Sequence, residues 1–141
     1  TPAAQKFEIG KALHLKEGTD LTIFATGHLV WESLEAAKTL AEAGVSAEVI
    51  NIHTIKPLDN KAILEAVKQT KCVVTAEEHM LNGGLGDSIA QLLGRELPTA
   101  IEMVGVNDTF GESGTPMQLL EKYGLDAKAI VAAAKKAIAR K

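Results

Sequence analysis

Hydrophobic and polar positions along the 141-residue chain fall into two alternating kinds of segment. The first kind is a short, nearly continuous apolar run, which predicts a strand buried on both faces of a sheet. Four runs have this pattern: Leu21–Thr26, Val45–Ile52, Cys72–Ala76 and Ala100–Val106. Glu102 interrupts the last run, so we expect that strand to lie nearer an edge of the sheet.

The second kind of segment repeats its apolar positions every three or four residues, as one face of a helix does. This period predicts helices over His28–Ala43, Leu85–Leu93 and Ala127–Ala139, and Asp59 stands where the N-cap of another would be. A capping box and a glycine stop bound one more predicted helix within Thr115–Gly124. Buried strands that alternate with helices predict a parallel sheet covered on both faces, in one domain.

Composition and charge exclude several classes of function. Hydrophobic residues make up 46% of the chain and charged residues 23%, which is typical of a folded domain and argues against disorder. The formal net charge is −3, and the one basic run, Lys135-Lys136 with Arg140-Lys141, lies at the end of the last predicted helix, where it complements the helix dipole. Neither nucleic acid nor a membrane surface is therefore an expected partner. No apolar run reaches membrane-spanning length. The single cysteine, Cys72, is expected to be a buried, inert thiol in a reducing, cytoplasmic compartment.

The stretch Cys72–Asp87 carries the candidate chemistry. After its strand we expect a polar loop, Glu77–Asn82, and then a glycine turn into a helix. Ligands of open α/β sheets bind beyond the carboxyl ends of strands, so Glu77, Glu78 and His79 are candidates for acid–base or metal chemistry. A structural interpretation explains the same residues: a strand-end Glu that caps a neighbouring helix, and a His that hydrogen-bonds a loop carbonyl.

Three glycines around the start of the predicted helix also permit two interpretations. Gly83, Gly84 and Gly86 would expose amides at the positive end of a helix, which favours a phosphate site. However, the sequence completes neither G-x-G-x-x-G nor the Walker pattern. The alternative is that the glycines permit a tight turn and close packing of the helix on the sheet.

Two other positions are candidates for contact with a partner. Trp31 falls on the polar face of its predicted helix, and tryptophan is enriched at the centres of interfaces. Asp108 opens a glycine-rich polar loop, which is typical of a docking or hinge loop but also of a plain connection. His14, His28 and His53 are scattered one per segment, and their spacing gives no indication of a metal site.

Several segments in order carry a resemblance to a known family. They are Phe7–Ala12, Thr22–Gly27, Ile52–Asp59, Thr75–His79 with Gly83–Gly86, and Gly105–Gly114 continuing to Leu119–Leu125. Together they resemble the C-terminal domain of transketolase, particularly of the split bacterial and archaeal type, over about Phe7 to Ile138. Deoxyxylulose-phosphate synthase and the β subunits of 2-oxo-acid dehydrogenases share this domain and stay as alternatives, although Phe110–Gly114 and Tyr123–Leu125 favour transketolase.

The resemblance implies a three-layer α/β/α fold with a five-stranded mixed sheet. Four strands would be parallel, and a short first strand over Ala12–Leu15 would be antiparallel to them. The domain would span residues 7–141, after a tail or linker remnant at residues 1–6. Because Thr1 is not an initiator methionine, we expect the chain to be a segment of something longer.

The resemblance also implies a function. Transketolases move two-carbon ketol units between sugar phosphates, with thiamine diphosphate and Mg²⁺ bound between two other domains. No catalytic, cofactor-binding or metal-binding residue is therefore expected here. The expected role is packing against the remaining domains or an N-terminal subunit and within a homodimer, with Trp31, Glu77, Glu78, His79 and Asp108 as candidate contacts. An alternative of another class is a free-standing regulatory or ligand-binding module that uses the loops at 77–86 and 108–114.

Overall fold

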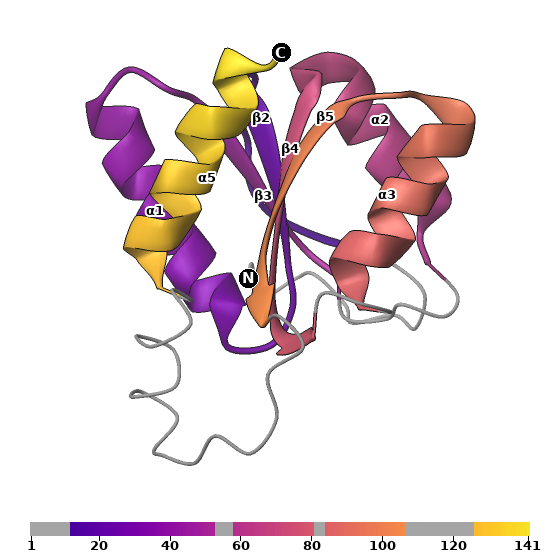
Figure 1. Cartoon of the computed structure of the whole chain (residues 1–141). Coiled ribbons are helices and arrows are strands. Elements are labelled where there is room, and N and C mark those ends of the chain that lie inside the picture. Colours follow the sequence, from indigo (N-terminus) through magenta and orange to yellow (C-terminus); the bar gives the residue numbers. More distant parts are fainter. Residues whose placement is uncertain (1–11, 53–57, 81–83, 107–125) are drawn as a thin grey trace.

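A central sheet with helices on both faces organises the computed structural model, which describes residues 12–52, 58–80, 84–106 and 126–141 (Figure 1). Helices α1 and α5 cover one face, and α2 and α3 cover the other. In chain order the elements are β1 (Leu13–Lys16), β2 (Leu21–Ala25), α1 (Leu29–Glu42), β3 (Ala47–Asn51), α2 (Asn60–Thr70), β4 (Cys72–Met80), α3 (Leu85–Glu96), β5 (Ala100–Val106) and α5 (Ala127–Ala139).

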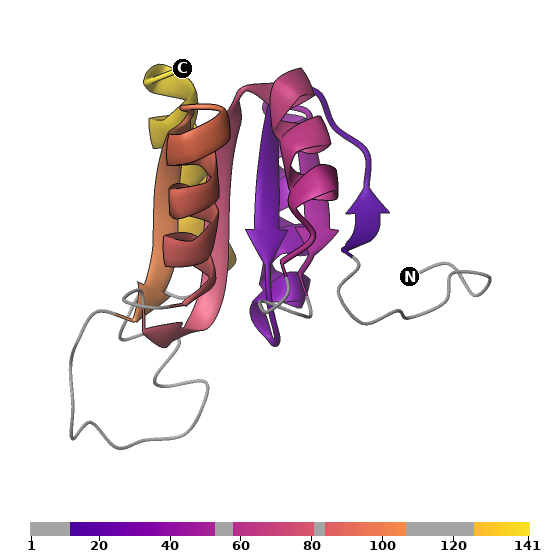
Figure 2. The same ribbon diagram turned by 90° about the vertical axis from the view of Figure 1, so that its right-hand side faces the viewer.

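The strand order across the sheet is β1-β3-β2-β4-β5. Strand β1 pairs antiparallel with β3, while β3, β2, β4 and β5 are parallel to one another. Figure 2 shows β1 at the edge of the sheet that lies away from α3. The three-layer fold with one short antiparallel strand is thus confirmed, and so is the edge position of the strand that contains Glu102.

Neighbouring residues of the central strands supply two separate hydrophobic cores. In β2, Ile23 packs into the core under α1 and α5, and Phe24 packs into the core under α2 and α3. Neither side chain is exposed to solvent. Because successive strand residues point to opposite faces, a strand covered on both faces must be apolar at every position. This requirement explains the continuous apolar runs in the sequence.

Two predicted N-caps and one predicted glycine stop are confirmed by side-chain contacts and backbone conformation. The carboxylate of Asp59 accepts the N–H of Ala62 at 3.3 Å, and that of Asp126 accepts the N–H of Ala129 at 3.0 Å. Gly44 follows α1 with a φ of +82°, in the left-handed region that favours glycine. Helix α3 extends three residues beyond the predicted end. None of the helices that the structure describes is long and apolar enough to cross a membrane.

The end of β4 differs from the sequence prediction. The expected polar loop from Glu77 is wrong for its first four residues, because the strand continues to Met80. After an irregularity beyond Ala76, Met80 again pairs with Val106 of β5, so the strand is held by its neighbour in spite of its polar sequence. The helix predicted within Thr115–Gly124 and the tail at residues 1–6 lie outside the described residues.

Candidate functional site

Glu77 joins the end of β4 to the first turn of α3. Its Oε1 accepts the N–H of Leu85 at 2.7 Å, and its Oε2 accepts the N–H of Gly86 at 2.7 Å. The side chain is 0% exposed. Two amides that have no partner within the helix are therefore satisfied, and a negative charge lies at the positive end of the helix. The capping interpretation is confirmed for Glu77.

Gly86 allows the first turn of α3 to lie directly against the sheet. A methyl group added here would lie 2.9 Å from Oγ1 of Thr75, 3.0 Å from Sδ of Met103 and 3.1 Å from its Cγ. These separations are shorter than normal van der Waals contacts. The packing interpretation of the glycines is thus confirmed at Gly86.

The start of α3 does not fit the diphosphate of a thiamine cofactor. A phosphate group bound at a helix N-terminus uses the free N–H groups of the first turn. Here the amides of Leu85 and Gly86 already donate to a buried carboxylate. A phosphate at this position would bring a second negative charge against Glu77 without those donors. The amides of Leu85 and Gly86 are therefore not available to a phosphate group.

The other candidates from this stretch have less structural definition. Glu78 and His79 continue β4 directly after Glu77, and their side chains are outside the description. Asp108 lies outside the described residues. The structure therefore places the backbone of Glu78 and His79 at the carboxyl end of β4.

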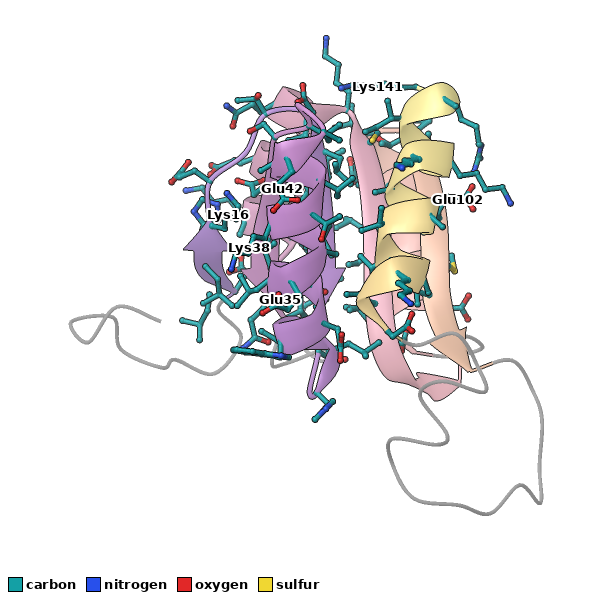
Figure 3. All side chains as sticks on the ribbon, turned by 90° about the vertical axis from the view of Figure 1, so that its left-hand side faces the viewer. Lys16, Glu35, Lys38, Glu42, Glu102 and Lys141 are labelled. Carbon is teal, nitrogen blue, oxygen red and sulfur yellow. The ribbon has the colours of Figure 1, made fainter. Side chains whose placement is uncertain are left out.

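Trp31 lies in the first turn of α1 and is 64% exposed. It is the one large hydrophobic side chain with such exposure among the described residues. Figure 3 shows Glu35, Lys38 and Glu42 along the outer side of the same helix, which confirms the predicted polar setting of Trp31. Next to it in sequence, Glu32 accepts the N–H of Ala127 at 3.0 Å and thereby joins the first turns of α1 and α5.

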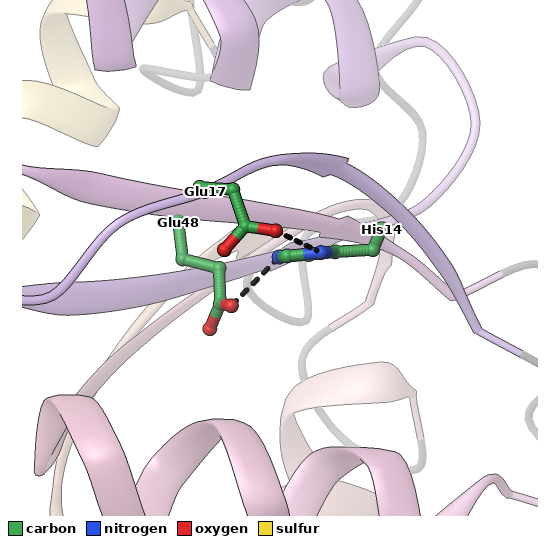
Figure 4. Close-up of side chains that lie close together, drawn as sticks. All are labelled: His14, Glu17 and Glu48. Carbon is green, nitrogen blue, oxygen red and sulfur yellow. Dashed lines mark hydrogen bonds and ion pairs between the residues drawn. The ribbon is translucent and has the colours of Figure 1, made fainter. Parts of the chain in front are cut away.

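A cluster of His14, Glu17 and Glu48 lies on the face of the sheet that α2 covers (Figure 4). Nε2 of His14 lies 2.7 Å from Oε2 of Glu48, and Nδ1 lies 3.4 Å from Oε1 of Glu17. The three residues have very different exposure: the side chain of Glu48 is 6% exposed, that of His14 is 36% exposed and that of Glu17 is 91% exposed. The imidazole ring therefore connects a buried carboxylate to one in solvent.

The hydroxyl of Thr22 contacts Glu48 and is itself in contact with the hydroxyl of Thr70. Thr22 donates to Oε1 of Glu48 at 3.0 Å, and its hydroxyl lies 2.6 Å from that of Thr70. The Thr70 hydroxyl also lies 3.1 Å from the carbonyl oxygen of Ala66, and both threonines are completely buried. Glu48 is thus fixed at both oxygens, by Thr22 on one side and by His14 on the other.

A hollow of about 290 Å³ adjoins this cluster, and all three of its side chains line it. Glu65 and Gln69 line it from α2. Three carboxylates and one imidazole therefore face this hollow. Its chemistry favours a cation over an anion.

Sequence reasoning did not identify this cluster. The available signal was Glu48 itself, a charge inside an otherwise apolar strand, because a buried carboxylate requires a partner. The sequence does not say which partner. His14 meets Glu48 because β1 lies antiparallel beside β3, with His14 opposite Ile50.

Glu102 has basic partners from the last helix. The guanidinium of Arg140 contacts the carboxylate of Glu102 and donates to the carbonyl of Ile101 at 3.1 Å, and Nζ of Lys136 lies 3.7 Å from Glu102. Lys141, labelled with Glu102 in Figure 3, donates to the carbonyl of Asp20 at 2.8 Å. The basic end of α5 is therefore part of the contact between that helix and the sheet.

Comparisons with known proteins give one consistent family. The family described as "Transketolase, C-terminal domain" matches residues 10–130. The 6-deoxy-6-sulfo-D-fructose transketolase subunit SqwH of Clostridium sp. (strain MSTE9) is 49% identical over 136 residues, which are 96% of this chain and 42% of that protein. The putative transketolase C-terminal section of Methanocaldococcus jannaschii is 45% identical over 126 residues, which are 88% of this chain and 39% of that protein.

A third relative and a solved structure agree with this result. The 1-deoxy-D-xylulose-5-phosphate synthase 1 of Geobacter sulfurreducens is 42% identical, over 97% of this chain and 22% of that protein. A solved structure titled "Split gene transketolase, inactive beta4 tetramer" superposes with a TM-score of 0.91 at 48% identity, covering 96% of this chain and 44% of the other. The chain thus spans less than half the length of these relatives. It belongs to the transketolase C-terminal domain family.

Proposed function

We propose that this chain is the C-terminal domain of a thiamine-diphosphate-dependent transketolase and contributes packing surfaces instead of catalytic groups. The complete enzyme would transfer two-carbon ketol units between sugar phosphates in the cytoplasm, as in the pentose phosphate pathway. Thiamine diphosphate and Mg²⁺ would bind on its other domains or on an N-terminal subunit. The short span of the chain relative to its relatives supports this division of labour.

One observation carries the non-catalytic role. The carboxyl ends of the strands are where an open α/β sheet binds its ligand, and α3 begins there. The Glu77 carboxylate occupies the first-turn amides of that helix, and Gly86 leaves no free space beneath it. Both residues serve the packing of helix on sheet.

Calorimetry of the purified 141-residue chain tests the proposal. Thiamine diphosphate titrated in the presence of Mg²⁺ should give no saturable heat, whereas the complete enzyme should bind under the same conditions. Saturable binding in the micromolar range by this chain alone would contradict the proposal. Ketol transfer should return only when the chain is combined with the domains that carry the cofactor site.

Trp31 is the proposed centre of the surface that contacts those domains or the second copy in a homodimer. An exposed indole on a polar helix face is typical of an interface hot spot that is open before assembly. Glu78, His79 and Asp108 are proposed as further polar contacts. The two described hydrogen bonds of the Glu77 side chain lie within the domain. We therefore expect Glu78 and His79, and not Glu77, to contact a partner.

Tryptophan fluorescence tests this surface directly, because the chain contains one tryptophan. The emission of the isolated chain should match a solvated indole and should shift to the blue when the partner domains are added. Trp31→Ala should weaken assembly by about 2 kcal/mol or more, whereas Lys38→Ala on the same helix should change it little. An unchanged emission spectrum in a complex verified by sedimentation would contradict the proposed surface.

Deoxyxylulose-phosphate synthase is the second candidate for the complete enzyme, favoured by the Geobacter relative at 42% identity. The two candidates differ in chemistry. A transketolase uses a ketose donor, whereas the synthase condenses a 2-oxo acid with a sugar phosphate and releases carbon dioxide. Carbon dioxide release by the reconstituted enzyme that depends on the sugar-phosphate acceptor would decide for the synthase.

A further inference from the structure

We propose that His14, Glu17 and Glu48 form a site for a divalent transition-metal ion of the zinc type, separate from the cofactor metal of the proposed enzyme. Each residue offers one ligand atom, and the three atoms lie within 4.8 Å of one another. Imidazole nitrogen and carboxylate oxygen are both ligand atoms that zinc takes in proteins. This inference does not rest on the proposed function.

The buried member of the set is already held in place. Oε2 of Glu48 lies 2.7 Å from Nε2 of His14, and Oε1 accepts the hydroxyl hydrogen of Thr22 at 3.0 Å. Metal-ligating carboxylates are themselves hydrogen-bonded in proteins, and this orientation raises metal affinity. The Thr22 hydroxyl, completely buried, would supply that orientation.

The exposed member gives the site its freedom to adjust. Zinc bonds to nitrogen and oxygen are about 2.0–2.2 Å long, so a metal between His14 and Glu48 requires a small increase in their separation. The ring belongs to a short edge strand, and the register of β1 on β3 is irregular between His14 and Lys16. Glu17 is 91% exposed, and as the third protein ligand it would exchange its 3.4 Å contact with Nδ1 of His14 for a bond to the metal.

The adjoining hollow provides the fourth position. It opens beside all three ligands and has room for water. Three protein ligands and one water are a usual zinc coordination, whereas Mg²⁺ prefers six oxygen ligands. Glu65, which lines the hollow from α2, adds negative charge that attracts a cation. The site therefore favours Zn²⁺ over Mg²⁺.

Titration of the purified protein with Zn²⁺ in a calorimeter tests the inference. We expect one saturable equivalent, with no competition from Mg²⁺ in large excess. Glu48→Gln preserves the shape of the buried side chain and should abolish binding, and Glu17→Gln should weaken it at least about tenfold. His28→Ala is the matched control: it removes an exposed histidine outside the cluster and should leave zinc affinity unchanged.

A spectroscopic measurement identifies the ligands. Co²⁺ in place of zinc should give visible absorption bands of a low-symmetry site in the wild-type protein, and His14→Ala should remove them. The inference is overturned if wild-type protein gives no saturable zinc binding, or if Glu17→Gln and Glu48→Gln bind zinc as wild type does. Since the Glu17 side chain is almost wholly in solvent, Glu17→Gln will fold, and the test stays decisive even if a buried variant does not.

Discussion

Substitution of Glu77 by alanine should unfold the start of α3 and lower the stability of the whole domain. The carboxylate is fully buried and makes two 2.7 Å hydrogen bonds, to the amides of Leu85 and Gly86. Hydrogen bonds to a charged group each contribute about 1.5–3 kcal/mol. Because the two bonds share one carboxylate and one helix end, their effects are not independent, and we expect a loss of about 3–4 kcal/mol.

Glu77→Gln should have an intermediate effect. Glutamine keeps one oxygen acceptor but places an NH₂ group against the second amide, so one of the two bonds is replaced by a contact between donors. The expected loss is about 2 kcal/mol. Urea unfolding followed by circular dichroism gives both values, with Glu42→Gln on the outer side of α1 as a control that should change stability by less than about 0.5 kcal/mol.

Anion rescue separates the cap from a general packing defect. Glu77→Ala frees two amides at the positive end of α3, so phosphate or formate should raise the melting temperature of this variant more than that of the wild type. A loss below 1 kcal/mol for Glu77→Ala, or an equal response of both proteins to the anions, would refute the reasoning. It would mean that the two bonds contribute little in the folded domain.

Three further predictions concern the packing of helices on the sheet. Gly86→Ala should destabilise the domain by about 1–3 kcal/mol in urea unfolding, because the added methyl group overlaps side chains of the sheet. In the same helix, a methyl group added at Gly94 meets nothing within 4 Å, so Gly94→Ala should stabilise the domain by close to 1 kcal/mol. Burial raises the pKa of the Cys72 thiol above its usual value of 9.0, so the thiol's contribution to stability is complete below that pH and is lost as the pH rises through the folded-state pKa. Cys72→Val should therefore remove this decline in stability, measured by urea unfolding from pH 8 upward. A thiol reagent should modify Cys72 only in urea. Arg140→Ala should cost less than about 1 kcal/mol and matter less in high salt, because its contact with Glu102 is half exposed.

Local patterns predicted the four parallel strands and the helices that alternate with them, whereas the short first strand was implied only by the family resemblance. A residue such as Phe24 had to be apolar because both faces of its strand are covered, and this requirement can be read from consecutive residues. The caps at Asp59 and Asp126 are equally local, since the acceptor and the amide it satisfies lie three residues apart. A strand-end Glu that caps a neighbouring helix was one of two interpretations that the sequence left open, and the structure assigns this role to Glu77, eight residues before Leu85.

Tertiary structure alone decided where the charges of distant segments meet. Glu48 and His14 are 34 residues apart, and they form a hydrogen bond only because an antiparallel strand is added beside β3. The continuation of β4 to Met80 likewise depends on the pairing of β4 with β5. The polar sequence after Ala76 would not by itself predict a strand. The interactions within a turn or a strand are encoded by adjacent residues, whereas the strand order that creates the His14 cluster is set by the packing of the whole sheet.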